Sequence, residues 1–183
     1  MIACISDLNQ ALLAIQAGQV LAYPTEAVYG LGCDPFNQKA VERILTLKGR
    51  SPEQGLLVLI ADWPQLFELI GTFPVARLAE IKETWPGPVT WVFPKSDCVP
   101  TWISGAHNTV AVRMTAHPVA QKLCQLGPIV STSANPHGQA SARSLTELER
   151  LFPKGLDGVV LGELGAEQQP SAIFDAATNQ RLR

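Results

Sequence analysis

The sequence predicts a single α/β domain, residues 1–183, built on a mixed β-sheet with helices packed against it. Three observations favour this fold class. A chain of 183 residues can form one domain with a full core, whereas two domains of that total length would be tight. Apolar runs of strand length alternate with amphipathic segments of helical periodicity. Neither an internal repeat nor a linker-like stretch interrupts this alternation, which is typical of one α/β unit.

In the first half of the chain, capping and stop residues mark two helices. The first is capped by Ser6 or Asp7 and ends at Gly18, and the second lies between Asn37 and Gly49. These residue types are favoured at helix ends because their side chains or backbone satisfy the free helical amides and carbonyls. In chain order, the predicted elements are a helix at 6–18, a strand at 20–24, a helix at 37–49, a buried strand at 55–61, and helices at 64–70 and 74–84.

In the second half, strands predominate. Val110 and Val112 alternate with smaller or polar residues, as in a half-buried strand. Pro118 suits the first turn of a helix, and Ser144 with Glu147 forms a capping box. The predicted elements are a turn and strand at 85–94, a strand at 108–114, a helix at 117–127, a strand at 128–132, a helix at 144–152, and short strands at 158–162, 171–175 and 180–183.

The composition is that of an ordinary globular protein. Hydrophobic residues make up 46% of the chain and charged residues 16%, which is not the signature of disorder. The longest aliphatic run, residues 55–61, is far too short to span a bilayer. The first ten residues lack the basic and apolar regions of a signal peptide. We therefore expect a cytoplasmic protein with no membrane partner.

The cysteines and histidines form no metal-binding pattern. The cysteines lie far apart and include no C-x-x-C pair: Cys4, Cys33, Cys98 and Cys124. We interpret them as small buried hydrophobic residues or inert thiols, and we predict no metal site. Glu26 and Asp34 are the acidic residues near the first motif below. The sequence leaves open whether either binds Mg²⁺ or is an ordinary surface carboxylate.

The net charge of −2 argues against a protein that coats nucleic acid, because such binding depends on many contacts to phosphates. A local basic patch stays open. Four basic residues fall within twelve positions: Lys39, Arg43, Lys48 and Arg50.

Three polar stretches carry the candidate chemistry, and each has a plain structural alternative. In "PTEAVYGLG", Thr25 and the G-x-G bring backbone close to a ligand or simply form a turn. In "LKGRS", Lys48 and Arg50 either complement a helix C-terminus or bind a polyphosphate. The "STSAN" segment, residues 131–135, is a plain loop or a cradle of donors for an anion. A serine nucleophile is a third interpretation, but no elbow motif or placed histidine supports it.

Taken together, these stretches predict a nucleotide site. Ligands of open α/β sheets bind beyond the carboxyl ends of strands, where Thr25, Arg113 and the 131–135 segment are expected. A cationic loop and two donor-rich strand ends around one pocket suit a nucleoside triphosphate. The chain shows no glycosidase carboxylate pair, Cys/His dyad or metal triad. The remaining chemistry is phosphoryl or nucleotidyl transfer, which depends on positioning and electrostatics.

Five ordered motifs, "YPTEAVYGLGCD", "LKGRSP", "WPGPVTWVFP", "VAVRMTAHP" and "STSAN", resemble those of the YrdC/TsaC family, the threonylcarbamoyl-AMP synthases. The resemblance runs from about Val20 to the last residues and matches the short form of the family. It implies a twisted, open mixed sheet with a positively charged concave face. It also implies synthesis of L-threonylcarbamoyladenylate and pyrophosphate from L-threonine, bicarbonate and ATP. Other transfer proteins would then use the product to form N6-threonylcarbamoyladenosine in tRNA.

The same resemblance implies roles for individual residues. Lys48 and Arg50 match a K-x-R motif and are the implied catalytic cations, acting with Mg²⁺ to neutralise the ATP phosphates. The implied ATP contacts are Lys48, Arg50, Ser131, Ser133, Asn135 and Arg143. The implied L-threonine contacts are Thr25, Arg113 and Ser171.

One residue departs from the family pattern. Many relatives carry a lysine where this chain has Gln54, so we expect weaker ATP affinity with activity retained. Two other functions stay open, namely non-catalytic binding of tRNA or double-stranded RNA by shape and action on another carbamoyl-type substrate. The sequence also leaves open the oligomeric state, the Mg²⁺ ligands and the route of the product to its transferase.

Overall fold

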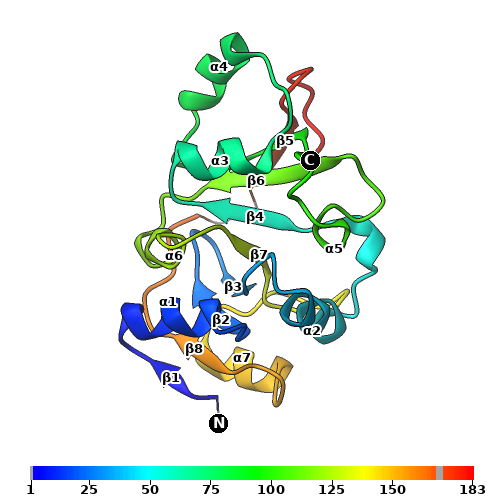
Figure 1. The fold of residues 1–183 in the computed structure, drawn as a ribbon. Helices are drawn as coiled ribbons and strands as arrows, with labels where there is room; N and C mark the ends of the chain where they lie inside the picture. The colour runs from blue at the N-terminus through cyan, green and yellow to red at the C-terminus, as the bar shows by residue number, and fades with distance from the viewer. Residues whose placement is uncertain (1, 168–170) are drawn as a thin grey trace.

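The computed structural model describes residues 2–167 and 171–183, and these form a nine-stranded sheet with helices packed against it (Figure 1). The strands lie in the order β1-β8-β2-β3-β7-β4-β6-β5-β9. Their bounds are β1 Cys4–Ile5, β2 Leu21–Pro24, β3 Tyr29–Gly32, β4 Leu57–Ile60, β5 Val89–Pro94, β6 Thr109–Met114, β7 Ile129–Ser133, β8 Gly158–Val160 and β9 Ala172–Asp175.

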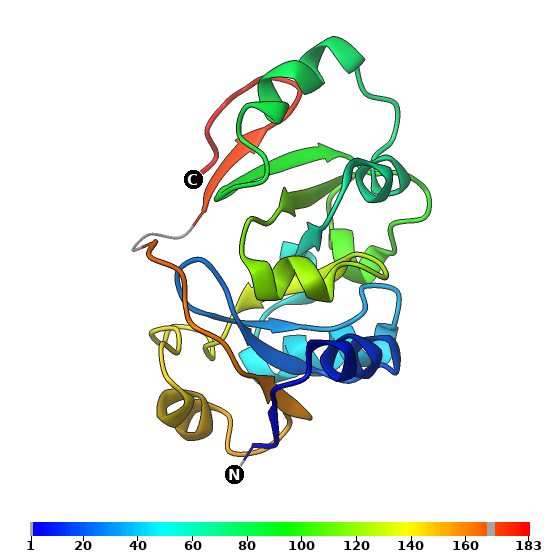
Figure 2. The ribbon, with the colours of Figure 1, turned by 90° about the vertical axis from the view of Figure 1, so that its left-hand side faces the viewer.

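The predicted mixed sheet is confirmed. Strand pairs β1/β8, β2/β8, β4/β6 and β5/β9 are parallel, and β2/β3, β3/β7, β4/β7 and β5/β6 are antiparallel. Figure 2 shows residues 161–167, which follow β8, running along one side of the molecule. Strand β9 pairs with β5. The C-terminal residues therefore return to the strands in the middle of the chain.

Most predicted helices are present with the expected caps. Asp7 accepts the backbone N–H of Asn9, and Asn37 accepts that of Ala40. Gly49 ends its helix with φ 60°, a left-handed conformation that glycine adopts without strain. The helices are α1 Leu8–Gln16, α2 Gln38–Lys48, α3 Trp63–Leu69, α4 Leu78–Lys82, α5 Thr101–Ser104, α6 Pro118–Leu123 and α7 Leu145–Leu151, with 3-10 turns η1 Pro52–Gln54 and η2 Val75–Arg77. No helix in the described ranges is long and apolar enough to cross a membrane.

Some predictions were wrong or incomplete. The 74–84 helix is divided into η2 and α4, and 180–183 contributes only an isolated bridge from Arg181 to Phe174. The two-residue β1 and the four-residue α5 were missed because such short elements leave no periodic pattern. Strand β3 was also missed, since its sequence, YGLG, contains two glycines.

The glycines of β3 make room for the buried ring of Tyr23. A Cβ on Gly32 would lie 2.6 Å from Cε1 of Tyr23 and 2.7 Å from the carbonyl oxygen of Val130, and a Cβ on Gly30 would lie 3.3 Å from Cζ of Tyr23. Both glycines are therefore needed for packing within the sheet. Gly30 also borders the cavity described below, so the approach of its backbone to a ligand stays a prediction.

The two faces of the central strands differ in chemistry. On β6, Val110 and Val112 point into the main hydrophobic core, whereas Thr109, Ala111 and Arg113 point to the other face. Because side chains alternate along a strand, β4, β5 and β7 show the same division. The core residues on these three strands are Val58, Ile60, Trp91, Phe93 and Val130.

Candidate functional site

A cavity of about 770 Å³ lies on the second face of these strands. Its floor consists of side chains two residues apart on neighbouring strands: Leu57, Thr90, Val92, Thr109, Ala111, Arg113, Ser131, Ser133 and Ile173. Register brings them together, since Leu57 pairs with Ala111 on one side and with Ser131 on the other. The cavity therefore extends across the strands themselves and not only beyond their ends, where the sequence predicted the site.

Seven of the nine predicted site residues line this cavity: Thr25, Arg50, Arg113, Ser131, Ser133, Arg143 and Ser171. The structure therefore gathers into one cavity residues that are separated by up to 146 positions in sequence (171 − 25). The other two, Lys48 and Asn135, do not border the cavity and bond to each other.

Lys48 is the last residue of α2 and holds the 131–135 segment in place. Its Nζ donates hydrogen bonds to the backbone carbonyls of Ser133 and Asn135 and to Oδ1 of Asn135. The same Oδ1 accepts a 2.7 Å bond from Oγ of Ser133. Burial and the nearby charge of Arg50 lower the pKa of Lys48 to about 8. The polar 131–135 segment is therefore held in place in part by the Lys48 ammonium group at the end of α2.

Guanidinium groups crowd the cavity and repel one another. Nη2 of Arg50 donates to the carbonyl of Gly55 at 2.8 Å, and its Nε is buried without a partner among the described residues. Burial and the charge of Arg183 lower the pKa of Arg50, and burial and the charge of Arg113 lower that of Arg183. An anion bound between these side chains would relieve both the repulsion and the desolvation.

Arg183 also lines the cavity, and it was not among the residues predicted from the sequence. The chain turns back after β9, so that the carbonyl of Arg183 accepts the backbone N–H of Ile173 at 3.3 Å. Nη2 of Arg183 donates to the carbonyl of Ser171 at 2.9 Å, and the residue lines the cavity. The signal for it was weak, because "QRLR" looked only like a short terminal strand.

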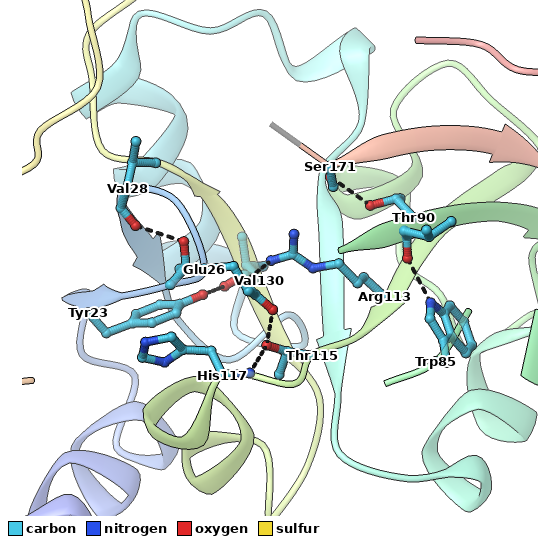
Figure 3. Close-up of polar contacts among 12 residues, drawn as sticks. Tyr23, Glu26, Val28, Trp85, Thr90, Arg113, Thr115, His117, Val130 and Ser171 are labelled. Atoms are coloured by element: carbon cyan, nitrogen blue, oxygen red, sulfur yellow. Dashed lines mark hydrogen bonds and ion pairs between the residues drawn. The ribbon is translucent and has the colours of Figure 1, made fainter. Parts of the chain in front are cut away.

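Arg113 forms a buried ion pair with Glu26 across the cavity wall (Figure 3). Nη2 of Arg113 lies 3.2 Å from Oε2 of Glu26, and the hydroxyl of Thr115 donates to Oε1 at 2.7 Å. Burial opposes ionisation of Glu26, but Arg113 and Thr115 outweigh it and hold the pKa of Glu26 below its usual range. Glu26 is therefore an ionised, mostly buried partner of Arg113 and not an ordinary surface carboxylate.

Two of the predicted hydroxyl groups already have partners. Oγ1 of Thr25 donates to the carbonyl of Val28 at 2.7 Å, which closes the turn between β2 and β3. Oγ of Ser171 lies 3.1 Å from Oγ1 of Thr90, and either hydroxyl can be the donor (Figure 3). Both hydroxyls keep lone pairs that can accept a bond from a ligand.

The described residues do not form a protein site for a metal ion. No group of three or more histidine, cysteine or acidic residues in 2–167 and 171–183 has the right arrangement. The carboxylates that line the cavity are Glu26, which is paired with Arg113, and Glu167. Mg²⁺ at this site would have to be carried mainly by substrate phosphates, as is common for this ion.

The family model described as "Telomere recombination", Sua5/YciO/YrdC, matches residues 13–183. The chain belongs to this family. Threonylcarbamoyl-AMP synthase from Pseudomonas paraeruginosa is 49% identical over 94% of this chain and 94% of its own length. Its counterpart from Coxiella burnetii is 45% identical over 97% of this chain and 96% of its own length. The recognition of the YrdC/TsaC family from five short motifs is confirmed.

Solved structures of the same family have the same fold. P. abyssi Sua5 in complex with L-threonine superposes with a TM-score of 0.87 at 36% identity and covers 96% of this chain. The chain spans 54% of that longer protein. YciO from E. coli superposes with a TM-score of 0.80 over 98% of the chain at 23% identity. The predicted YrdC-like fold, a mixed sheet flanked by helices, is thereby confirmed.

Proposed function

We propose that this protein is a threonylcarbamoyl-AMP synthase, a nucleotidyltransferase that forms L-threonylcarbamoyladenylate and pyrophosphate. The observation that carries the proposal is the identity of 45–50% with enzymes of that name over 94–97% of the chain. The cavity supports it independently, because it offers hydroxyl groups and two arginines whose Nε atoms have no partner among the described residues. Such a surface is suited to anionic substrates.

The proposed reaction brings several anions together. The amine of L-threonine adds to bicarbonate with loss of water and forms a carbamate. A carbamate oxygen then attacks the α-phosphorus of ATP, and pyrophosphate leaves. Because nucleophile and electrophile are both negatively charged, the main task of the protein is to screen their repulsion and hold them in line.

We assign the polyphosphate to the arginine-rich part of the cavity. Arg50 and Arg183 have pKa values lowered by burial and by neighbouring cations, and a bound phosphate would stabilise their charged forms. Lys48 does not reach the polyphosphate in this proposal but holds Ser133 and Asn135 by hydrogen bonds to their backbone carbonyls. The remaining nucleotide contacts in this proposal come from Ser131, Ser133 and Arg143, and Asn135 supports them from outside the cavity through its hydrogen bonds with Ser133 and Lys48.

We assign L-threonine to the wall around Arg113. Its planar guanidinium can pair with the substrate carboxylate through two parallel hydrogen bonds. Thr25 and Ser171 border the same cavity and supply oxygen atoms for the rest of the amino acid. In the solved complex of P. abyssi Sua5, which is 36% identical, L-threonine is the bound ligand.

The proposal includes partners that rest on the family alone. Bicarbonate is the third substrate, and Mg²⁺ accompanies ATP as its counter-ion. The product would serve threonylcarbamoyl transfer to tRNA by other proteins in the cytoplasm. Exclusion of bulk water matters because a carbamoyl adenylate hydrolyses readily.

The test is release of pyrophosphate from ATP by the purified protein, with and without L-threonine and bicarbonate. We expect release only when both are present. Ser133→Ala should reduce the rate because it removes the 2.7 Å bond to Asn135 and a hydroxyl of the cavity floor, whereas Asp157→Asn, far from the cavity lining, should not. A folded protein that releases no pyrophosphate but shifts double-stranded RNA would refute the synthase and favour an RNA-binding role.

A further inference from the structure

Glu26 is placed to control the direction of the Arg113 side chain. The side chains of Arg113 and Glu26 are only 9% and 12% exposed, so their 3.2 Å contact is shielded from water. The pair links two segments that are distant in sequence, since Glu26 follows β2 and Arg113 lies in β6. Both residues line the cavity.

A chain of hydrogen bonds fixes the Glu26 carboxylate (Figure 3). The backbone N–H of His117 donates to Oγ1 of Thr115 at 3.1 Å, and the hydroxyl of Thr115 donates a hydrogen bond to Oε1 of Glu26 at 2.7 Å. Because a hydroxyl has one proton, each donor and acceptor in this chain has a defined role. Oε2 is thereby left for Arg113.

The backbone of the same residue is held as well. The carbonyl of Glu26 accepts the N–H of Glu167 at 2.9 Å, and the carbonyl of Thr25 accepts that of Gly165 at 2.9 Å. A Cβ on Gly165 would lie 2.6 Å from the carbonyl oxygen of Glu26, so only glycine allows this approach. Glu26 is therefore anchored through both its side chain and its backbone.

The ion pair uses one nitrogen of Arg113 and leaves the rest of the guanidinium fork for a ligand. Nε of Arg113 is buried and has no partner among residues 2–167 and 171–183. A buried N–H without a partner is costly unless a ligand satisfies it. A planar carboxylate accepts from two adjacent N–H groups of a guanidinium when the two planes are aligned, so a guanidinium already held at that angle binds it at a lower entropic cost.

We propose that Glu26 is a positioning residue for substrate binding, which holds Arg113 at the angle needed to receive the carboxylate of the amino-acid substrate. This inference rests on the proposed function and deepens it. Glu26 acts through Arg113 and does not touch the carboxylate, which its own negative charge would repel. Thr115 supports Glu26 and is the next positioning residue in the chain.

The test measures the Michaelis constants of Glu26→Gln for L-threonine and for ATP separately. We expect the constant for L-threonine to rise about tenfold or more, since a charge-assisted hydrogen bond in a buried site is lost. The constant for ATP should stay within about twofold. Thr115→Val should give a smaller rise in the constant for L-threonine, because Glu26 keeps its charge but loses one restraint. Asp157→Asn breaks the ion pair with Arg43 away from the cavity and is the matched control, with no change in either constant.

A double-mutant cycle with Arg113→Lys separates positioning from direct contact, because residues that act through one another are not additive. In the Arg113→Lys protein, Glu26→Gln should change the constant for L-threonine by less than about twofold. An equal rise in both backgrounds would mean that Glu26 contacts the substrate itself and would overturn the inference. A fall in the constant would also overturn it, since Glu26 would then compete with the substrate for Arg113.

The failure of this inference can be told apart from failure of the proposed function. If the wild-type protein turns over with L-threonine but Glu26→Gln leaves the constants unchanged, only the inference is wrong. If no turnover occurs, calorimetric titration of the wild-type protein and Glu26→Gln with L-threonine still tests the inference. A wild-type protein that neither turns over nor binds L-threonine contradicts both.

Discussion

The ammonium group of Lys48 should make ATP binding depend on pH between about 7.5 and 9. Burial and Arg50 lower its pKa from 10.5 to about 8, so the folded protein disfavours the charged form by roughly 3 kcal/mol. Lys48 does not border the cavity, but the negative charge of ATP bound beside the 131–135 segment favours the charged form, so ATP binding should raise this pKa again. At pH 8.5 Lys48 is therefore mostly uncharged in the free protein, and binding should take up part of a proton from the buffer.

The assay is calorimetric titration with ATP at pH 8.5 in two buffers of different ionisation enthalpy, which counts protons taken from the buffer. We also expect ATP affinity to fall about tenfold from pH 7 to pH 9, since the protonated fraction of Lys48 falls from about 0.9 to about 0.1 over this range. Lys48→Arg stays charged throughout and should bind ATP without uptake and without this pH dependence. Uptake near zero by the wild-type protein would refute the reasoning.

The same lowered pKa has an effect on stability with a defined sign. Between pH 8 and 10.5, the folded protein binds fewer protons at Lys48 than the unfolded chain does. The contribution of this group to the free energy of unfolding therefore rises with pH across that window. Other groups titrate there too, so the measurement is the difference between wild-type and Lys48→Met unfolding curves at pH 7.5 and 10.

Three further predictions concern single substitutions. Gln54 lies at an exposed position of the cavity wall. Gln54→Lys should lower the Michaelis constant for ATP about two- to fivefold, which is the effect of one exposed charge contact. No change would show that a lysine here is not a phosphate ligand. Arg183→Ala should weaken ATP binding about tenfold and reduce its dependence on salt, because a cation of the cavity is removed, and unchanged binding in calorimetry would contradict that role. Gly32→Ala should lower the melting temperature by about 3–10 °C, since its Cβ would lie 2.6 Å from the Tyr23 ring and overpacking costs about 1–3 kcal/mol; an unchanged melting temperature would show that the ring can move aside.

The sequence predicted best what depends on local interactions. Asp7, Asn37, Gly49 and Ser144 each act within a few residues of their own position, and all four cap or end a helix as expected. Strand β3 was missed for the opposite reason, because its glycines are explained only by a ring that packs across from the neighbouring strand. Local propensity is overridden where tertiary packing decides the conformation.

In the candidate site, too, local motifs were predicted and contacts between distant segments were not. The order of the motifs was enough to predict seven residues that line the cavity. It could not show that Lys48 points away from the cavity and bonds to the 131–135 segment. That contact depends on two segments about 85 residues apart in sequence. Arg183 was missed because its place depends on a backbone return after β9 that has no sequence signature.

The charges of the cavity explain why so many of its cations lack full partners. Four arginines line it against two carboxylates, and one of those carboxylates, Glu26, is already committed to Arg113. Such an excess of positive charge destabilises the folded protein by itself, because mutual repulsion disfavours the ionised groups, and desolvation adds to this where the side chain is buried, as at Arg113. It becomes favourable once polyphosphate and carboxylate groups enter. The same unpaired N–H groups that cost stability in the free protein are thus the ones available to bind substrate, so weakening the repulsion by a mutation such as Arg183→Ala should stabilise the free protein while it lowers ATP affinity.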